Sequence, residues 1–186
     1  MTKKDFEKMV KVIGFLMISN NVYEKQYPVF DCSIRIDFEK ELIIYPELSG
    51  LKITNHSTCN FSDSENFVVL ECVNRLLEKG YRPNHIELEK TWTLGHDTKG
   101  GRSDICVSGE DGKTLFIIEC KTFGKPYIRE YHNTCNDGGQ IFSYWQQERN
   151  CKWLVLYASY FDGSSVIYKT ESIRRWWYSG LQCQCI

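Results

Sequence analysis

The chain has 186 residues, of which 42% are hydrophobic and 14% are aromatic. This length and apolar content suit one domain with a sizeable core. Its 23 Lys and Arg residues and 24 Asp and Glu residues give a net charge of −1. Proteins that bind nucleic acid unaided usually carry a basic surplus, because phosphate contacts and counterion release drive their binding. Composition alone therefore argues against a self-sufficient nucleic-acid binder.

The sequence shows no sign of a membrane segment or of a disulfide framework. No stretch approaches the roughly 20 apolar residues that span a bilayer, and no secretory cleavage site follows the start. The nine cysteines are odd in number and scattered, and none of them pairs at a spacing typical of a zinc site. We therefore expect reduced thiols in a cytoplasmic protein. Four cysteines in apolar segments are expected to pack as small hydrophobes: Cys72, Cys106, Cys120 and Cys151.

The first 62 residues are expected to form an N-terminal helix and β-hairpin extension that packs on the core. Apolar residues at helical spacing predict a helix over residues 4–17. Alternating apolar and polar residues over 29–45 predict a hairpin that turns at Glu39 and Lys40. Residues 46–62 carry Pro, Gly and Asn and are expected to form a loop.

Residues 63–186 are expected to form an α/β core. Asp63 or Ser64 caps a predicted helix that ends at Gly80. The patterns that follow predict, in order, strands over 85–94, 102–108 and 113–122, a helix over 138–149, strands over 152–159 and 165–170, and a final helix over 171–181. The order α-β-β-β-α-β predicts a central mixed β-sheet flanked by helices.

An acid-x-Lys triplet that continues an apolar strand is the main chemical signal. Glu119, Cys120 and Lys121 directly follow the apolar run 115–118. Alternate residues of a strand share a face, so Glu119 and Lys121 point the same way, and Asp104 on the preceding strand can meet them. Two carboxylates and the Cys120 carbonyl are hard oxygen ligands suited to Mg²⁺. A nearby lysine suits metal-assisted phosphodiester hydrolysis, because negative charge develops on the phosphate.

A structural interpretation of this triplet remains open. The sequence contains two other acid-x-Lys triplets, at 97–99 and 111–113, and both lie in predicted turns. A Glu–Lys pair at a strand end also explains Glu119 and Lys121, because charges beside a buried strand must be paired or bound to an ion.

The order of the motifs resembles the PD-(D/E)xK nuclease superfamily. The resemblance is strongest to the N-terminal nuclease domains of type I restriction enzyme R subunits and to fused restriction–methylation enzymes. Those domains carry a helix with a glutamate, a strand with an aspartate, a strand with Glu-x-Lys and a helix with Gln-x-x-x-Tyr. Within residues 63–160, all four parts of this pattern match in order: a helix glutamate, Asp104, Glu119 with Lys121, and Gln140 with Tyr144. The proline of the family's name is absent before Asp104, a variation common in the family.

The resemblance implies a restriction-endonuclease-like core and a role for each matching residue. Asp104 and Glu119 would hold one or two Mg²⁺ ions, for which Mn²⁺ is expected to substitute. Lys121 would orient the attacking water and stabilise the charge on the phosphate. Gln140 and Tyr144 would contact the DNA backbone or brace the site, although an ordinary amphipathic helix also explains them.

The helix glutamate of the pattern has two candidates. On a helical wheel Glu65 lies in the apolar stripe expected to face the sheet, whereas Glu71 lies on the polar side. We therefore assign the role to Glu65. A first-turn acid favoured by the helix dipole is the structural alternative.

Two weaker features lie outside these motifs. Lys125, Arg129 and His132 follow the strand of the triplet and either line the DNA path or belong to a solvated loop. The run 174–178, Arg-Arg-Trp-Trp-Tyr, resembles a stacking surface for single strands. A packing helix is the favoured interpretation of that run.

The resulting hypothesis is a Mg²⁺-dependent endodeoxyribonuclease domain of a restriction–modification system. Double-stranded DNA would be its substrate, and motor, specificity or methyltransferase domains would be its partners. The chain would then be a fragment or the N-terminal domain of a longer protein. The alternatives are a catalytically silent nuclease-like module for nucleic-acid binding or assembly, and a repair or RNA-directed nuclease with the same core. The net charge of −1 then predicts weak intrinsic affinity and dependence on partners.

Overall fold

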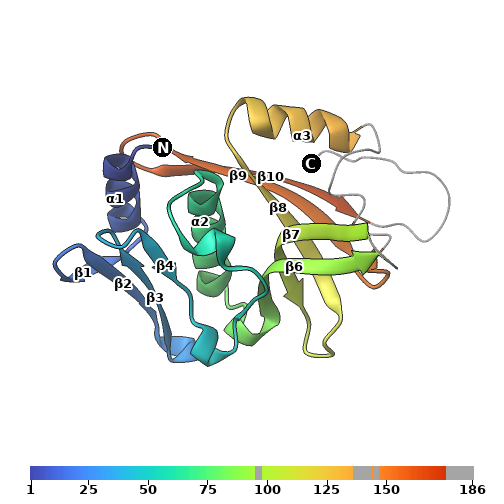
Figure 1. Cartoon of the computed structure of the whole chain (residues 1–186), viewed down its shortest axis with the longest axis horizontal. Coiled ribbons are helices and arrows are strands. Elements are labelled where there is room, and N and C mark those ends of the chain that lie inside the picture. The colour runs from blue at the N-terminus through green and yellow to red at the C-terminus, as the bar shows by residue number, and fades with distance from the viewer. Residues whose placement is uncertain (95–97, 136–143, 145–146, 175–186) are drawn as a thin grey trace.

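Two β-sheets form the frame of the protein (Figure 1). The computed structural model describes residues 1–94, 98–135, 144 and 147–174. The N-terminal sheet is antiparallel, in the order β1 (Leu16–Ser19), β2 (Val22–Tyr27), β3 (Cys32–Asp37) and β4 (Leu42–Ile44). The larger sheet has the order β10 (Val166–Arg174), β9 (Trp153–Phe161), β8 (Thr114–Thr122), β7 (Thr98–Ser108), β6 (Ile86–Leu94) and β5 (Lys52–Ile53). It is a mixed sheet, because β5–β6 and β8–β9 are parallel pairs and the others are antiparallel.

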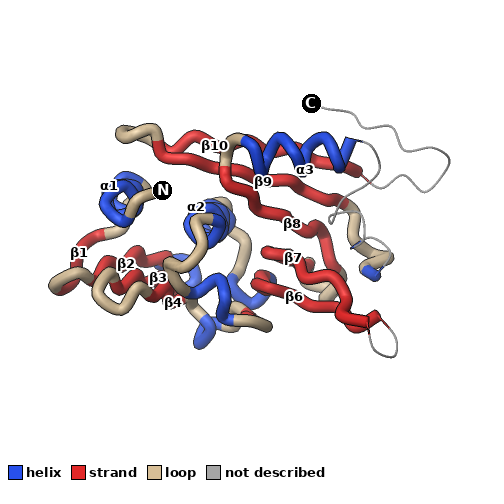
Figure 2. The backbone as a smooth tube through the Cα atoms, turned by 45° about the horizontal axis from the view of Figure 1, so that its top comes forward, coloured by secondary structure: helices blue, strands red, loops and turns tan. Residues whose placement is uncertain are grey.

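The described α-helices are α1 (Lys3–Val12), α2 (Glu65–Glu78) and α3 (Lys125–Cys135). α2 lies between the two sheets (Figure 2), and α3 packs on the opposite face of the six-stranded sheet. The alternation along β9 separates these two faces. Tyr157 belongs to the cluster around α2, whereas Leu156 and Ala158 pack with Tyr127 of α3. The predicted mixed sheet flanked by helices is therefore confirmed.

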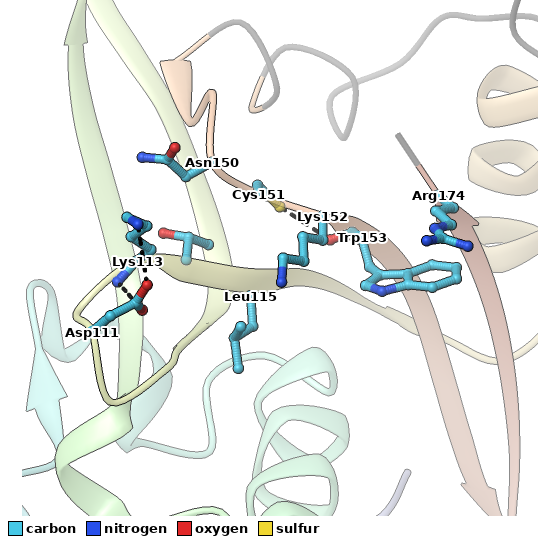
Figure 3. Close-up of a pocket in the computed structure, with 9 residues that line it drawn as sticks. Asp111, Lys113, Leu115, Asn150, Cys151, Lys152, Trp153 and Arg174 are labelled. Carbon is cyan, nitrogen blue, oxygen red and sulfur yellow. Dashed lines mark hydrogen bonds and ion pairs between the residues drawn. The ribbon is translucent and has the colours of Figure 1, made fainter. Parts of the chain in front are cut away.

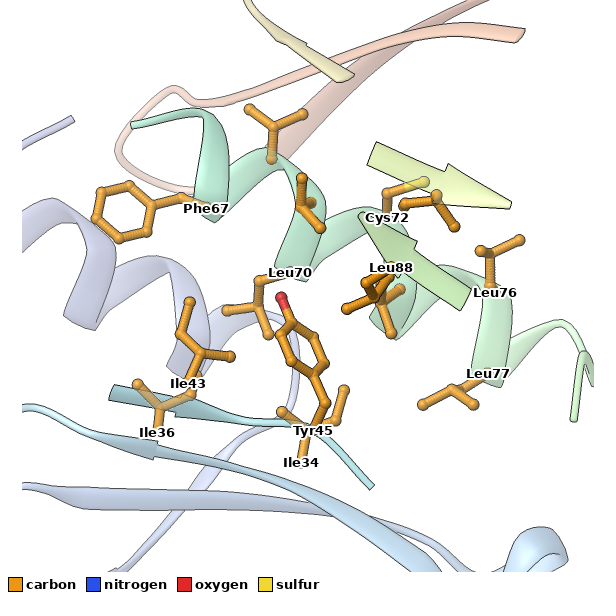
Figure 4. Packing of buried hydrophobic residues seen from close by; sticks show 14 of the residues in the cluster. Ile34, Ile36, Ile43, Tyr45, Phe67, Leu70, Cys72, Leu76, Leu77 and Leu88 are labelled. Atoms are coloured by element: carbon orange, nitrogen blue, oxygen red, sulfur yellow. The ribbon is translucent and has the colours of Figure 1, made fainter. Parts of the chain in front are cut away.

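α2 is buried on nearly every side. Eleven of its 14 residues are buried, because one sheet covers each side of the helix. Ile34, Ile36 and Tyr45 of the N-terminal sheet segment pack on one side, and Leu88 of β6 packs against the helix from the larger sheet (Figure 4). The helix begins where the Asp63 side chain accepts the Glu65 N–H at 2.9 Å. It ends before Gly80, whose φ is +92°, as the sequence predicts.

The first helix is shorter than predicted. The pattern over residues 4–17 correctly identifies Phe6, Met9 and Val10 as its buried face. The helix nevertheless ends at Val12, because Gly14 adopts a φ of +93°. The N–H groups of Gly14 and Phe15 then bond to the carbonyls of Lys11 and Val10, at 3.1 and 2.9 Å. This is the hydrogen-bond pattern of a glycine-centred helix stop.

The N-terminal segment contains more strands than predicted. The hairpin expected over 29–45 is confirmed as β3 and β4. It belongs to a four-stranded sheet, because β1 and β2 precede it. Every residue of β1 is exposed, so this strand has no apolar alternation by which the sequence pattern could reveal it. The stretch 46–62, expected to be loop, contains three-residue and four-residue 3₁₀ turns and the short strand β5.

The C-terminal half also differs from the prediction. Residues 125–135 form α3, which was not predicted. The predicted helix over 138–149 lies mostly outside the described residues, but Tyr144 within it is helical. The final helix predicted over 171–181 is wrong as far as Arg174, because β10 continues to that residue and pairs it with Trp153 of β9. Residues 175–181 lie outside the described part of the chain.

Two further expectations concern cysteines and membranes. Six described cysteines are free and buried, in agreement with the reduced thiols predicted: Cys32, Cys59, Cys72, Cys106, Cys120 and Cys151. Among the helices of the described residues, none has the length and apolar character needed to cross a membrane.

The position of α2 makes Leu70 a test of the fold. Leu70 is 0% exposed, and its replacement by Ala leaves a cavity that neither sheet can close without moving. We expect Leu70→Ala to lower the free energy of unfolding by about 2–5 kcal/mol. Equilibrium urea unfolding measures this loss. Leu48→Ala is the control, because Leu48 is fully exposed and its truncation should change stability by less than about 0.5 kcal/mol.

Candidate functional site

β7 and β8 bring the predicted carboxylates together. The two strands are antiparallel, with Ile105 opposite Ile118, so Asp104 comes next to Glu119. The Oδ2 atom of Asp104 accepts a hydrogen bond from the backbone N–H of Cys120 at 2.6 Å. The N–H and C=O of one residue in a strand point to the same edge, so the Cys120 carbonyl is directed toward the same strand as Asp104.

Lys121 forms the centre of an ion-pair cluster. Its Nζ atom donates to Oε1 of Glu119 at 2.8 Å and to Oε1 of Glu65 at 2.7 Å. Glu65 is the first residue of α2, and the helix between the two sheets carries its carboxylate to the end of β8. The structure therefore joins Glu65 to the Glu-x-Lys triplet, as the assignment from the sequence requires.

Tyr144 contacts the cluster from a third element. Its side chain is fully buried, and its hydroxyl lies 2.6 Å from the Arg102 carbonyl and 3.0 Å from Oε2 of Glu119. The two carboxylate oxygens of Glu119 thus face different partners, Lys121 on one side and Tyr144 on the other. Gln140, its predicted companion, lies outside the described residues.

Burial shifts the ionisation of these groups. Glu119 is 1% exposed, and burial raises its pKa although hydrogen bonds from Lys121 and Tyr144 act in the opposite direction. Burial and the neighbouring Glu119 carboxylate raise the pKa of Asp104 well above its ordinary value. Burial disfavours the charged form of Lys121, but Glu119 and Asp104 outweigh this effect and raise its pKa. The lysine is therefore a permanent cation of the site.

The donor atoms at this site are suited to a hard divalent cation. Carboxylate oxygens of Asp104 and Glu119 and the carbonyl of Cys120 are the ligand types that Mg²⁺ prefers. Within the described part of the chain, no group of three or more His, Cys, Asp or Glu side chains is arranged to hold a metal. A metal here would therefore need the backbone carbonyl, water or substrate oxygens in addition to the two carboxylates.

Comparison with known families gives a match over the part of the chain that contains this site. Residues 64–161 match the family described as Type I restriction enzyme R protein N terminus. The match spans more than half of the chain and contains every site residue named above. The chain belongs to the type I restriction enzyme R protein N-terminal family. No curated protein matches the chain. The family match confirms the resemblance to type I R subunits and indicates a nuclease domain of a restriction system.

Within this R-protein N-terminal domain, Glu71 does not lie where the helical wheel predicts. It is 1% exposed rather than on a polar face. Its carboxylate pairs with Arg75 at 2.6 Å and accepts a hydrogen bond from Tyr157 of β9. The wheel assumed a helix with one solvated side, whereas both sides of α2 are covered. Glu71 therefore joins α2 to β9. Among the hydrogen bonds and ion pairs of the described residues, none joins Glu71 to the cluster around Lys121.

Sequence reasoning missed Glu89, a buried carboxylate beside the site. Its φ is +56°, a conformation that costs a non-glycine residue about 1–3 kcal/mol and often marks functional sites. It is 5% exposed, burial raises its pKa, and its Oε2 lies 2.6 Å from Nε of Arg102. Arg102 in turn supplies the carbonyl that Tyr144 contacts. No feature of the sequence indicates the left-handed backbone at Glu89.

The two weaker sequence features have different outcomes. Lys125, Arg129 and His132 lie on the exposed side of α3, so the solvated-loop interpretation is wrong and the residues share a helix surface. Arg174 belongs to β10, with its guanidinium 5.4 Å from the ring centroid of Trp153. Residues 175–178 lie outside the described part of the chain.

A pocket of about 410 Å³ lies at the opposite end of β8 from Lys121 (Figure 3). It forms where the β7–β8 hairpin meets the start of β9 and the end of β10, and Leu115 and Trp153 line it. Glu119 is four residues beyond Leu115, about 13 Å along an extended strand. This pocket is therefore separate from the carboxylate cluster.

The raised pKa of Asp104 predicts that this residue destabilises the metal-free fold near neutral pH. The group stabilises the protein below its ordinary pKa near 3.8, and this contribution is lost as pH rises through the higher folded-state pKa. We expect Asp104→Asn, which keeps an acceptor for the Cys120 N–H, to raise the free energy of unfolding near pH 7 by about 1 kcal/mol.

Urea unfolding in the presence of EDTA near pH 7 and near pH 4 measures this effect. The increase in the free energy of unfolding of Asp104→Asn should be largest near pH 7 and smaller near pH 4. Asp111→Asn in the exposed hairpin is the matched control and should change little. A less stable Asp104→Asn protein near pH 7 would contradict the assignment of a raised pKa.

Proposed function

We propose that this domain is a Mg²⁺-dependent endonuclease that hydrolyses phosphodiester bonds of double-stranded DNA within a restriction system. The observation that carries the proposal is the convergence of three separate chain segments on the Glu119–Lys121 triplet of β8. β7 contributes Asp104, α2 contributes Glu65, and a helical segment contributes Tyr144. A structural Glu–Lys pair at a strand end would not require these additional groups.

The charge balance of the cluster supports a divalent cation. Three carboxylates, those of Glu65, Asp104 and Glu119, surround the single ammonium of Lys121. Two negative charges therefore remain uncompensated when all groups are ionised, and this excess contributes to the raised pKa of Asp104. A divalent cation would neutralise such an excess, and its oxygen ligands would be Asp104, Glu119 and the Cys120 carbonyl.

The roles of the side chains follow from their contacts. A bound Mg²⁺ would polarise the phosphate and lower the pKa of water. Lys121, charged and held by two glutamates, would orient water and stabilise the negative charge that develops as water adds to phosphorus and the leaving P–O bond breaks. Glu65 would keep the ammonium in place, and Tyr144 would fix the carboxylate plane of Glu119.

The net charge of −1 supports a domain that other parts of a restriction complex deliver to DNA. Without a basic surplus the domain has little non-specific affinity of its own. Motor, specificity or methyltransferase partners would supply that affinity. The same dependence would limit stray cleavage.

Plasmid cleavage tests the proposal. We expect supercoiled DNA to be nicked and cut with Mg²⁺ or Mn²⁺ and to remain intact with EDTA. Lys121→Met and Asp104→Asn should each lower the rate by at least about 100-fold, because each removes charge from the reacting phosphate or its metal.

The hairpin residues Asp111 and Lys113 provide matched controls. They form the same acid-x-Lys triplet but are exposed, so Asp111→Asn and Lys113→Met should cleave at the rate of the unmodified protein. Cleavage that survives both site substitutions would refute the site. Parallel reactions with single-stranded RNA separate an RNA-directed nuclease from one that acts on DNA.

Metal binding is a second, independent test. Isothermal calorimetry with Mn²⁺ should detect binding to the unmodified domain and its loss in Asp104→Asn and Glu119→Gln. Each variant removes one carboxylate charge while preserving size, so we expect the fold to be retained. A protein that binds neither Mn²⁺ nor Mg²⁺ and cuts no nucleic acid would be the catalytically silent alternative.

A further inference from the structure

The carboxylate of Glu148 joins the helical segment of Tyr144 to two strands of the sheet. Oε1 accepts hydrogen bonds from Nζ of Lys90 at 2.6 Å and from Nε1 of Trp92 at 3.0 Å, and Oε2 accepts one from the Thr114 hydroxyl at 3.1 Å. Lys90 and Trp92 lie on β6, and Thr114 begins β8. These bonds lower the pKa of Glu148 although burial opposes them, so the group is an ionised acceptor.

Glu148 is mechanically linked to Tyr144. It follows Tyr144 by four residues, and its N–H donates to the Tyr144 carbonyl at 2.8 Å. The indole of Trp92 also stacks on the phenol ring of Tyr144, with centroids 5.3 Å apart and an angle of 27° between the rings. Glu148 therefore anchors Tyr144, whose hydroxyl contacts Glu119.

The backbone of β6 is adapted to this arrangement. In a regular strand Leu88, Lys90 and Trp92 would share one face. Leu88 instead packs in the core around α2, whereas Trp92 packs with the cluster that contains Tyr144. The left-handed conformation of Glu89, between them, breaks the alternation. The strained backbone at Glu89, together with a shift in the β6–β7 register between Thr91 and Thr93, thus directs Lys90 and Trp92 to Glu148.

We propose that Glu148 is a positioning residue that sets the place of the Tyr144 hydroxyl against Glu119. This inference rests on the proposed nuclease function, because it assigns Glu148 a role in that reaction through Tyr144. The side chains of Lys90 and Glu148 are 22% and 19% exposed. Removal of one partner from so buried a pair leaves an unpaired charge, which favours displacement of the whole segment.

A purely structural role for Glu148 makes a different prediction. Loss of the anchor would then lower stability, but Tyr144 would keep its contacts in the molecules that remain folded. A readout of the Tyr144 hydroxyl itself distinguishes the two roles, and it does not depend on catalysis.

Fluorine NMR of protein labelled with meta-fluorotyrosine supplies this readout. Of the 11 tyrosines, the signal of Tyr144 is the one absent from Tyr144→Phe, and Glu119→Gln should shift it. We expect Glu148→Ala to move this signal in the folded protein, and Glu148→Gln, which retains one acceptor oxygen for Lys90 and Trp92, to move it less.

Glu24→Ala is the matched control for these spectra. Glu24 also collects a hydroxyl and a cation, from Ser33 at 2.7 Å and Arg35 at 2.8 Å, but it lies in the N-terminal sheet. This variant should leave the Tyr144 signal in place. An unchanged Tyr144 signal in Glu148→Ala would overturn the proposal.

Cleavage kinetics then test the functional consequence. Glu148→Ala should lower kcat on the order of 10-fold with little change in KM, and Glu148→Gln should recover part of the rate. Added to Tyr144→Phe, Glu148→Ala should cost little more, because both act through one hydroxyl. Additive losses would overturn the positioning role. If the unmodified domain does not cleave, the nuclease proposal fails, and a shifted Tyr144 signal still supports control of that hydroxyl by Glu148.

Discussion

The burial of α2 between two sheets is the constraint on which the candidate site depends. A helix covered on both sides cannot rotate or slide without opening a core that includes Leu70 and Tyr45. Its first residue, Glu65, is thereby held within hydrogen-bond distance of Lys121. Among the hydrogen bonds and ion pairs of the described residues, none joins the N-terminal sheet to a predicted catalytic residue. The sheet nevertheless covers the second side of α2, and this packing holds Glu65 in place.

The part of the site that follows strand geometry could be predicted from the sequence. Alternation alone places Glu119 and Lys121 on one face, and the antiparallel β7–β8 pair brings Asp104 beside them. The position of Glu65 also follows from a helix that faces the sheet. The pattern fails at Glu71, since a helical wheel carries no information about a second covering layer. That layer includes β1 and β2, and the exposed strand β1 lacks the alternation by which strands are recognised.

The elements that hold the site in place escaped prediction for a different reason. They depend on the backbone conformation of single residues, which the residue type does not predict. Gly14 lies inside the helix predicted over residues 4–17, although glycine favours positive φ. Glutamate does not favour positive φ, and Glu89 adopts +56° nonetheless. This residue changes the face to which Lys90 points, and a shift in the β6–β7 register between Thr91 and Thr93 adds a second irregularity at Trp92. A period-two pattern misassigns every side chain beyond such a switch.

The electrostatics of the site and of the whole chain lead to one conclusion. The cluster carries more carboxylates than cations, so a DNA phosphate approaching it without a metal is repelled. The net charge of −1 provides no compensating attraction elsewhere. In the proposed function, a divalent cation at the carboxylates would remove the first of these repulsive effects, and other domains that hold the DNA would compensate for the second. A nuclease built in this way would cut slowly on its own with a divalent cation, and faster when other domains hold the DNA against it.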